Sequence, residues 1–170
     1  MIITTTKRAL PTTDDLHAVI DRVTGTYHVT LQVQLSRLDR LLTNVAAHYG
    51  LSYVKLQPLA QLFIELQRAL GSHVADQEQV LFPLLRRLSA HEETHSDALL
   101  TALHEGRHTD ERIASLFHQI SELTGGYDPA LDTCSAYQDI VQTLESLDEQ
   151  TRKHFEAEAA LMARLEQAGI

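Results

Sequence analysis

Four long segments of this chain carry apolar residues at spacings of three and four, and this pattern constrains the fold more than any other feature. Such spacing places the apolar side chains on one face of an α-helix. The predicted helices span Thr13 or Asp14 to Tyr49, Pro58 to Leu88, Thr94 or Ser96 to Leu123, and Asp128 to Glu166. No segment alternates as a strand does, and the breaks are short. The sequence therefore predicts an all-α, up-down-up-down four-helix bundle.

Three positions interrupt the helical pattern. Pro83 lacks the N–H for a bond to Gln79 and is predicted to kink the second helix. Gly25 is a weak point in the first helix. In the third helix, the apolar face of the C-terminal half does not continue smoothly into the N-terminal half. A π-bulge is therefore predicted near Gly106–Asp110, a kind of irregularity that is frequent at functional sites.

The size and charge of the chain restrict its class. Its 170 residues suit a single domain, residues 1–170, in which 1–13 form an N-terminal extension. The net charge of −9 argues against nucleic acid as a partner. Cys134 is the single cysteine, which excludes an internal disulfide and a multi-cysteine metal site. There is no secretory signal pattern and no apolar run of about 18 residues, so no membrane association and a cytoplasmic location are expected.

Each predicted helix carries at least one histidine on or near its apolar stripe. These are His28 on the first helix, His73 on the second, His104 and His108 on the third, and His154 on the fourth. Glu158 follows His154 by four residues, so both side chains lie on one helical face. A charged carboxylate is costly to bury unless it is paired or binds a metal.

The positions of these histidines along the helices agree. With a rise of about 1.5 Å per residue, they fall at one height of an antiparallel bundle to within about two turns. Imidazoles and a carboxylate that converge between apolar walls favour a first-row transition metal, and across a bundle they suit a pair of irons. A single histidine on an apolar stripe is more often a satisfied core residue, so the metal hypothesis rests on the joint pattern. The remaining candidates are interpreted as surface or helix-end residues: His17, His91, His95 and His118.

Two other chemistries are less well supported. His48 lies about 30 Å along the same predicted helix from His28, so both cannot serve one site. Cys134 is interpreted as a small buried apolar residue rather than a nucleophile. Neither a Ser-His-Asp arrangement nor a Gly-rich phosphate loop is found in the sequence.

Three segments resemble the hemerythrin-like (HHE) cation-binding domains, and within them the di-iron repair-of-iron-centres proteins. The segments are His73–Pro83 with its Leu-Phe-Pro ending, Leu123–Tyr137 with Pro129 and Cys134, and His154-Phe-Glu-Ala-Glu158. His28, 45 residues before His73, stands where the first histidine of that family would. The resemblance covers about residues 20–160 and implies a non-haem metal site with His28, His73, His154 and Glu158 among the ligands.

The sequence also departs from that family. Gln77 replaces a bridging glutamate, and a neutral amide cannot supply that carboxylate; Glu78, at spacing i,i+5 from His73, is the candidate substitute. The third-helix ligand is either His108, which fits the distance to Cys134, or His104, which fits the distance from His73, or both. Leu161-Met162-Ala163 replaces the usual Leu-Phe-Pro. The cysteine-containing N-terminal domain of those repair proteins is expected to be absent.

The resemblance implies a cytoplasmic iron-binding protein, with two irons per chain if the site is intact. Its expected role is iron handling, or the binding or sensing of O2 or NO during stress. No substrate is indicated, so the sequence leaves catalysis open. The alternatives are a mononuclear zinc or manganese site, or a degenerate bundle that serves as a protein-interaction module, which Gln77 favours. An exposed helical stripe could also support a homodimer.

Overall fold

The computed structural model describes residues 13–49, 56–90, 96–131 and 134–167, and the regular structure in these ranges is entirely helical. The first arm of the bundle comprises α1 (Thr13–Arg22), the π-helical turn η1 (Val23–His28) and α2 (Val29–Tyr49). The second arm comprises α3 (Leu56–Asp76), the π-helical turn η3 (Gln77–Leu81) and α4 (Phe82–Ser89). The third and fourth arms are α5 (Ser96–Leu123) and α6 (Ser135–Gln167), with the 3₁₀ turn η4 (Pro129–Leu131) between them. The predicted all-α bundle is confirmed.

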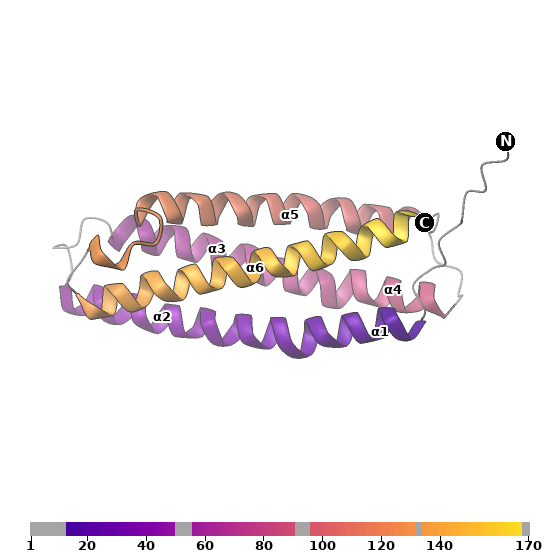
Figure 1. Cartoon of the computed structure of the whole chain (residues 1–170), viewed down its shortest axis with the longest axis horizontal. Coiled ribbons are helices and arrows are strands. Elements are labelled where there is room, and N and C mark those ends of the chain that lie inside the picture. The colour runs from indigo at the N-terminus through magenta and orange to yellow at the C-terminus, as the bar shows by residue number, and fades with distance from the viewer. Residues whose placement is uncertain (1–12, 50–55, 91–95, 132–133, 168–170) are drawn as a thin grey trace, which may run out of the picture.

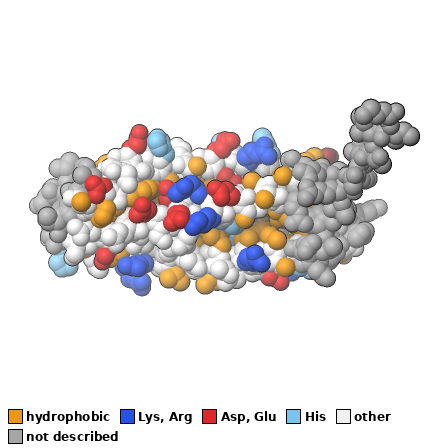
Figure 2. Space-filling model, in the orientation of Figure 1, with side chains coloured by type: hydrophobic (Ala, Val, Ile, Leu, Met, Phe, Trp, Pro, Cys, Tyr) orange, Lys and Arg blue, Asp and Glu red, His pale blue; other side chains and the backbone are white. Residues whose placement is uncertain are grey.

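Each arm runs antiparallel to the one before it in the sequence, so that α1 begins and α6 ends at the same end of the bundle (Figure 1). The third arm, α5, packs along α3, and α6 packs along α2, while α1 packs against α4. On the face drawn in Figure 2, charged side chains of both signs lie over the middle of the bundle, and apolar side chains gather beside the residues drawn in grey. Among the described residues, no helix is long and apolar enough to cross a membrane.

The interior of the bundle consists of two apolar clusters, each with members from all four arms. One cluster includes Leu31, Leu70, Ile113 and Leu147. The other comprises Leu16, Ile20, Leu81, Phe82, Leu85, Leu99, Leu161 and Leu165. Along every arm the gap between the two clusters contains at least one buried or half-buried polar residue. The bundle therefore has a polar layer between two apolar cores, formed mainly by His28, His73, Gln77, Asp110, His154 and Glu158.

The helical irregularities lie in the first two arms, so the predicted π-bulge near Gly106–Asp110 is wrong. The third arm is α-helical from Ser96 to Leu123, whereas η1 contains Gly25 and η3 directly precedes Pro83. Within η3 the N–H of Phe82 bonds to the carbonyl of Gln77, five residues back. A π turn at this point accommodates a proline that cannot donate to the preceding turn.

The end of the third arm was predicted correctly, and the start of the fourth was not. After Leu123 the backbone takes positive φ at Gly125 (68°), Gly126 (80°) and Tyr127 (61°), which ends the helix. The Ala130 N–H then donates to Asp128 Oδ1 at 2.8 Å, which forms a turn. Because of this turn, Pro129 begins a short 3₁₀ segment, and α6 begins only at Ser135.

Candidate metal centre

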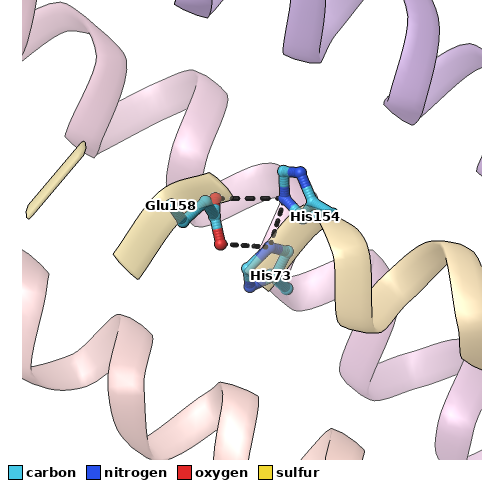
Figure 3. Close-up of side chains that lie close together, drawn as sticks. All are labelled: His73, His154 and Glu158. Atoms are coloured by element: carbon cyan, nitrogen blue, oxygen red, sulfur yellow. Dashed lines mark hydrogen bonds and ion pairs between the residues drawn. The ribbon is translucent and has the colours of Figure 1, made fainter. Parts of the chain in front are cut away.

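Three side chains from two arms converge in the polar layer. His73 near the end of α3 meets His154 and Glu158, which lie one turn apart on α6 (Figure 3). The two Nε2 atoms are 3.3 Å apart, His154 Nε2 is 3.0 Å from Glu158 Oε1, and His73 Nε2 is 3.8 Å from Glu158 Oε2. Both imidazoles are buried, and 13% of the Glu158 side chain is exposed. One atom from each residue lies within 4.8 Å of the other two, which is close enough for a shared cation.

Asp110 on α5 holds the other side of the His73 ring. Its Oδ1 lies 3.0 Å from His73 Nδ1, the nitrogen that faces away from the cluster. A histidine that binds a metal through one nitrogen commonly has the other fixed by a carboxylate, which sets its tautomer and orientation. Asp110 therefore leaves His73 Nε2 directed at His154 and Glu158.

Two buried carboxylate oxygens at this site lack a hydrogen-bond partner among the described residues. They are Asp110 Oδ1 and Glu158 Oε1, which approach imidazole nitrogens closely without satisfying hydrogen-bond geometry. A buried carboxylate oxygen without a partner is costly, and a cation held by His73, His154 and Glu158 would remove that cost for Glu158 Oε1. The donor set of two imidazoles and one carboxylate therefore fits a transition-metal ion, and its three ligands leave further coordination positions available.

His28 forms a second pair of contacts in the same layer. Its Nδ1 lies 2.6 Å from Glu78 Oε1, and its Nε2 lies 2.9 Å from Gln77 Oε1. Both partners belong to η3, where the wider π turn brings adjacent residues toward the same ring. Gln77 is buried, whereas 45% of the Glu78 side chain is exposed.

Tyr27 closes the site between the first and fourth arms. Its ring stacks on that of His154, with centroids 3.7 Å apart and planes inclined by 10°. Its hydroxyl donates to Thr151 Oγ1 at 3.3 Å. Burial raises the pKa of Tyr27 to about 12, the Thr151 bond opposes that rise, and the nearby charges of Glu158 and Asp110 add to it. The phenol therefore stays neutral and fixes the plane of the His154 ring.

The structure brings together four of the six candidate residues that were identified in the sequence. His28, His73, His154 and Glu158 lie in one layer, as the helix heights predicted. His104 and His108 are instead exposed on α5 and contribute nothing to the cluster found among the described residues.

The phase of the third helix explains this difference. A helix turns by about 100° per residue, so His108 points almost opposite to Asp110, two positions later. The inward face of α5 runs through Leu99, Leu103, Gly106, Asp110, Ile113, Phe117 and Ile120. These residues keep spacings of three and four, so the stripe is unbroken and includes a glycine and an aspartate. Extending the stripe back from Ile113 would have identified Asp110, which the sequence analysis missed.

The comparisons with known proteins agree with this architecture. The family model described as hemerythrin HHE cation binding domain matches residues 20–128. The chain is similar to the iron-sulfur cluster repair protein ScdA of Staphylococcus haemolyticus, with 26% identity over 145 residues, which cover 85% of this chain and 64% of the relative. It is also similar to ScdA of Staphylococcus epidermidis, with 22% identity over 144 residues, which cover 85% of this chain and 63% of the relative.

The chain spans less than two thirds of the length of these curated relatives. No solved structure matches it significantly. The match to the family model nevertheless covers well over half of the 170 residues and includes three of the four arms. The chain therefore belongs to the hemerythrin HHE cation-binding domain family.

Proposed function

We propose that this protein binds non-haem iron in the polar layer of the bundle. The observation that carries the proposal is the convergence of His73 Nε2, His154 Nε2 and the Glu158 carboxylate between two apolar cores. Imidazole and carboxylate ligands suit iron among the first-row metals. The names of the curated relatives, iron-sulfur cluster repair proteins, favour iron over zinc or manganese.

The layer offers two unequal positions for metal. The stronger position has His73, His154 and Glu158 as ligands, with Asp110 orienting His73. The weaker position has His28 and Glu78, which already lie 2.6 Å apart. Gln77 stands between the two positions with a neutral amide, which binds iron less well than a carboxylate and cannot bridge as one. We therefore expect the first iron to bind more tightly than the second.

The proposed biological role is iron handling under stress in the cytoplasm, in line with the repair function that the names of the relatives state. When bound, iron would supply an open coordination position for a diatomic molecule such as O2 or NO. The protein side chains would bind the ion and fix the imidazole rings.

Elemental analysis tests the proposal directly. Protein purified without chelators is loaded with ferrous iron under anaerobic conditions, desalted, and analysed for iron with an absorption spectrum before and after exposure to air. We expect at least one iron per chain in the native protein, and less than a tenth of that in His73→Ala and His154→Ala. The matched controls His104→Ala and His118→Ala, which remove exposed imidazoles, should retain it. Native iron content in both core variants would refute the site.

Gln77 supports a second candidate function. If its amide prevents stable iron binding, the bundle serves as a protein-interaction module, as a monomer or homodimer, with a weak, mononuclear or absent metal site. Iron stoichiometry separates these readings: about two irons indicate a dinuclear centre, about one indicates that only the stronger position binds, and none in a folded helical protein indicates the interaction module.

A further inference from the structure

A cavity of about 470 Å³ adjoins the candidate metal centre. Its walls come from α3 and η3, from α5 and from α6, and His73 and Glu158 form part of its lining. Pockets for small organic ligands typically measure about 300–1,000 Å³. The cavity is therefore of the size that an organic molecule needs, and a diatomic molecule would leave most of it unfilled.

Small residues of α5 and α6 border this space. Gly106 occupies a position of the inward stripe of α5 that holds a large apolar side chain elsewhere, and a Cβ added there would meet nothing within 4 Å. Ala102 lines the cavity from the same helix, and Ala159 and Ala163 line it from α6. The backbone leaves room for a Cβ at Gly106, so the missing side chain there is a feature of the sequence rather than a packing limit.

The lining combines apolar and polar side chains. Its larger apolar side chains are Val80, Leu81, Leu103, Phe155 and Met162. The ionisable lining residues are His73, the carboxylates Asp110 and Glu158, whose buried oxygens lack hydrogen-bond partners among the described residues, and the exposed Asp76, Glu105 and Arg107. Four carboxylates and one arginine line the cavity, so the lining repels a free anion, whereas a bound ferric ion attracts one. A ligand of this cavity therefore needs an apolar body and a head group whose oxygens can coordinate the ion.

We propose that the cavity binds a small organic molecule with an apolar body and an oxygen-donor head group, which coordinates the iron held by His73, His154 and Glu158. This inference rests on the proposed function, because the head group requires the ion. It adds a class of ligand to the site and assigns specificity to the walls on α5 and α6.

Two hydroxamates of different length test the proposal. The iron-loaded, air-oxidised protein is desalted, its iron content is measured, and it is titrated with acetohydroxamate or octanohydroxamate while the visible band of the ferric complex is recorded. Each buried methylene strengthens binding by about fourfold. Burial of only two or three of the six additional carbons gives octanohydroxamate a preference of at least about tenfold. The metal-free protein should bind neither probe in equilibrium dialysis.

A cavity-filling variant and a matched control locate the binding. Gly106→Leu places an isobutyl group where the cavity lies and should reduce the preference for octanohydroxamate to less than threefold while iron content stays native. Gly71→Leu makes the same change at an exposed helical glycine outside the cavity, with nothing within 4 Å of an added Cβ, and should keep the native preference. Circular dichroism shows whether each variant folds, and the chain-length preference of the native protein is decisive without them.

The outcomes separate the two proposals. Iron-loaded protein that binds both hydroxamates equally, or native preference in a folded Gly106→Leu variant, overturns the organic ligand and leaves iron binding intact. Octanohydroxamate binding to metal-free protein also overturns it. Failure to take up iron overturns both proposals.

Discussion

The polar layer contains two groups of contacts, one around His73 and one around His28. His73 is held from three sides, by Asp110, His154 and Glu158, whereas His28 contacts Glu78 and the amide of Gln77. The first half of the layer thus has two imidazoles and two carboxylates, whereas the second has one imidazole, one carboxylate and a neutral amide. Two substitutions test whether Gln77 and Asp110 act as described.

Gln77→Glu should raise the iron content after identical loading from about one toward two per chain. The new carboxylate would lie where the amide oxygen is now, 2.9 Å from His28 Nε2 and facing the stronger position. Gln79→Glu adds the same charge to an exposed neighbour and should leave the iron content unchanged. Equal gains in both variants would mean that added negative charge, not the buried position, recruits the second iron.

Asp110→Asn should weaken iron binding by about 10- to 100-fold, the usual cost of losing the group that orients a ligating histidine. Competition with a chelator of known affinity measures the change. Because Asp110 lies opposite the bound nitrogen of His73, the helix content should stay native. The matched control is Glu111→Gln, an exposed carboxylate next along α5. An affinity equal to that of the native protein would exclude an orienting role for Asp110.

At the scale of elements, the apolar stripes predicted four helices and most of their ends, because long helices with spacings of three and four leave few alternatives. They also predicted the height of the layer. In antiparallel helices of similar length, residues that lie equally far from the same end of the bundle are at the same height. The prediction for α5 is wrong at Gly106 and Asp110, which lie on the inward face of the helix. Because neither residue is a large apolar one, the stripe looks interrupted there, and the interruption suggests a change of helical phase that does not occur. The π turns were placed in the wrong arm for the same reason.

The pair Gly71→Ala and Gly126→Ala should change stability in opposite directions. Gly71 is exposed within α3 and a Cβ there meets nothing within 4 Å, so alanine should stabilise the helix by about 0.5–1 kcal/mol. Gly126 has φ of +80°, which strains any side chain, so alanine should cost about 1 kcal/mol or more. Urea unfolding followed by circular dichroism measures both, and equal signs would refute the conformational argument.

At the scale of the whole molecule, one phenol ties the turn between α5 and α6 to the bundle. The Tyr127 hydroxyl lies 3.2 Å from the Phe117 carbonyl and 3.1 Å from Asp148 Oδ2, and both are acceptors. Burial raises the pKa of Tyr127 well above its ordinary value, and the Asp148 charge and hydrogen bond add to the rise. Tyr127→Phe removes the hydrogen bond and should destabilise the protein by about 1–2 kcal/mol.

The same residue gives the protein a dependence on alkaline pH. The unfolded chain releases the phenol proton near pH 10, whereas the folded protein retains it at that pH. The contribution of Tyr127 to the free energy of unfolding is therefore complete below pH 10 and is lost as the pH rises above it. In urea unfolding between pH 8 and 11.5, the free energy of unfolding should decline less in Tyr127→Phe than in the native protein. Equal declines would assign the effect to other groups.

Metal binding should stabilise the entire bundle, because the ligands come from different arms. Ferrous iron at a hundred times its dissociation constant should raise the free energy of unfolding by about 2.7 kcal/mol. The melting temperature measured anaerobically should rise with iron, fall again with chelator, and stay constant in His73→Ala. An equal rise in that variant would place the bound metal elsewhere.

The division of the interior into two apolar clusters has a consequence for how this fold can evolve. Each cluster joins all four arms by itself, so neither depends on the residues of the layer between them. Mutations in that layer can exchange one coordination chemistry for another, or abandon it, while the scaffold persists. The architecture can therefore be inherited separately from the chemistry of the layer.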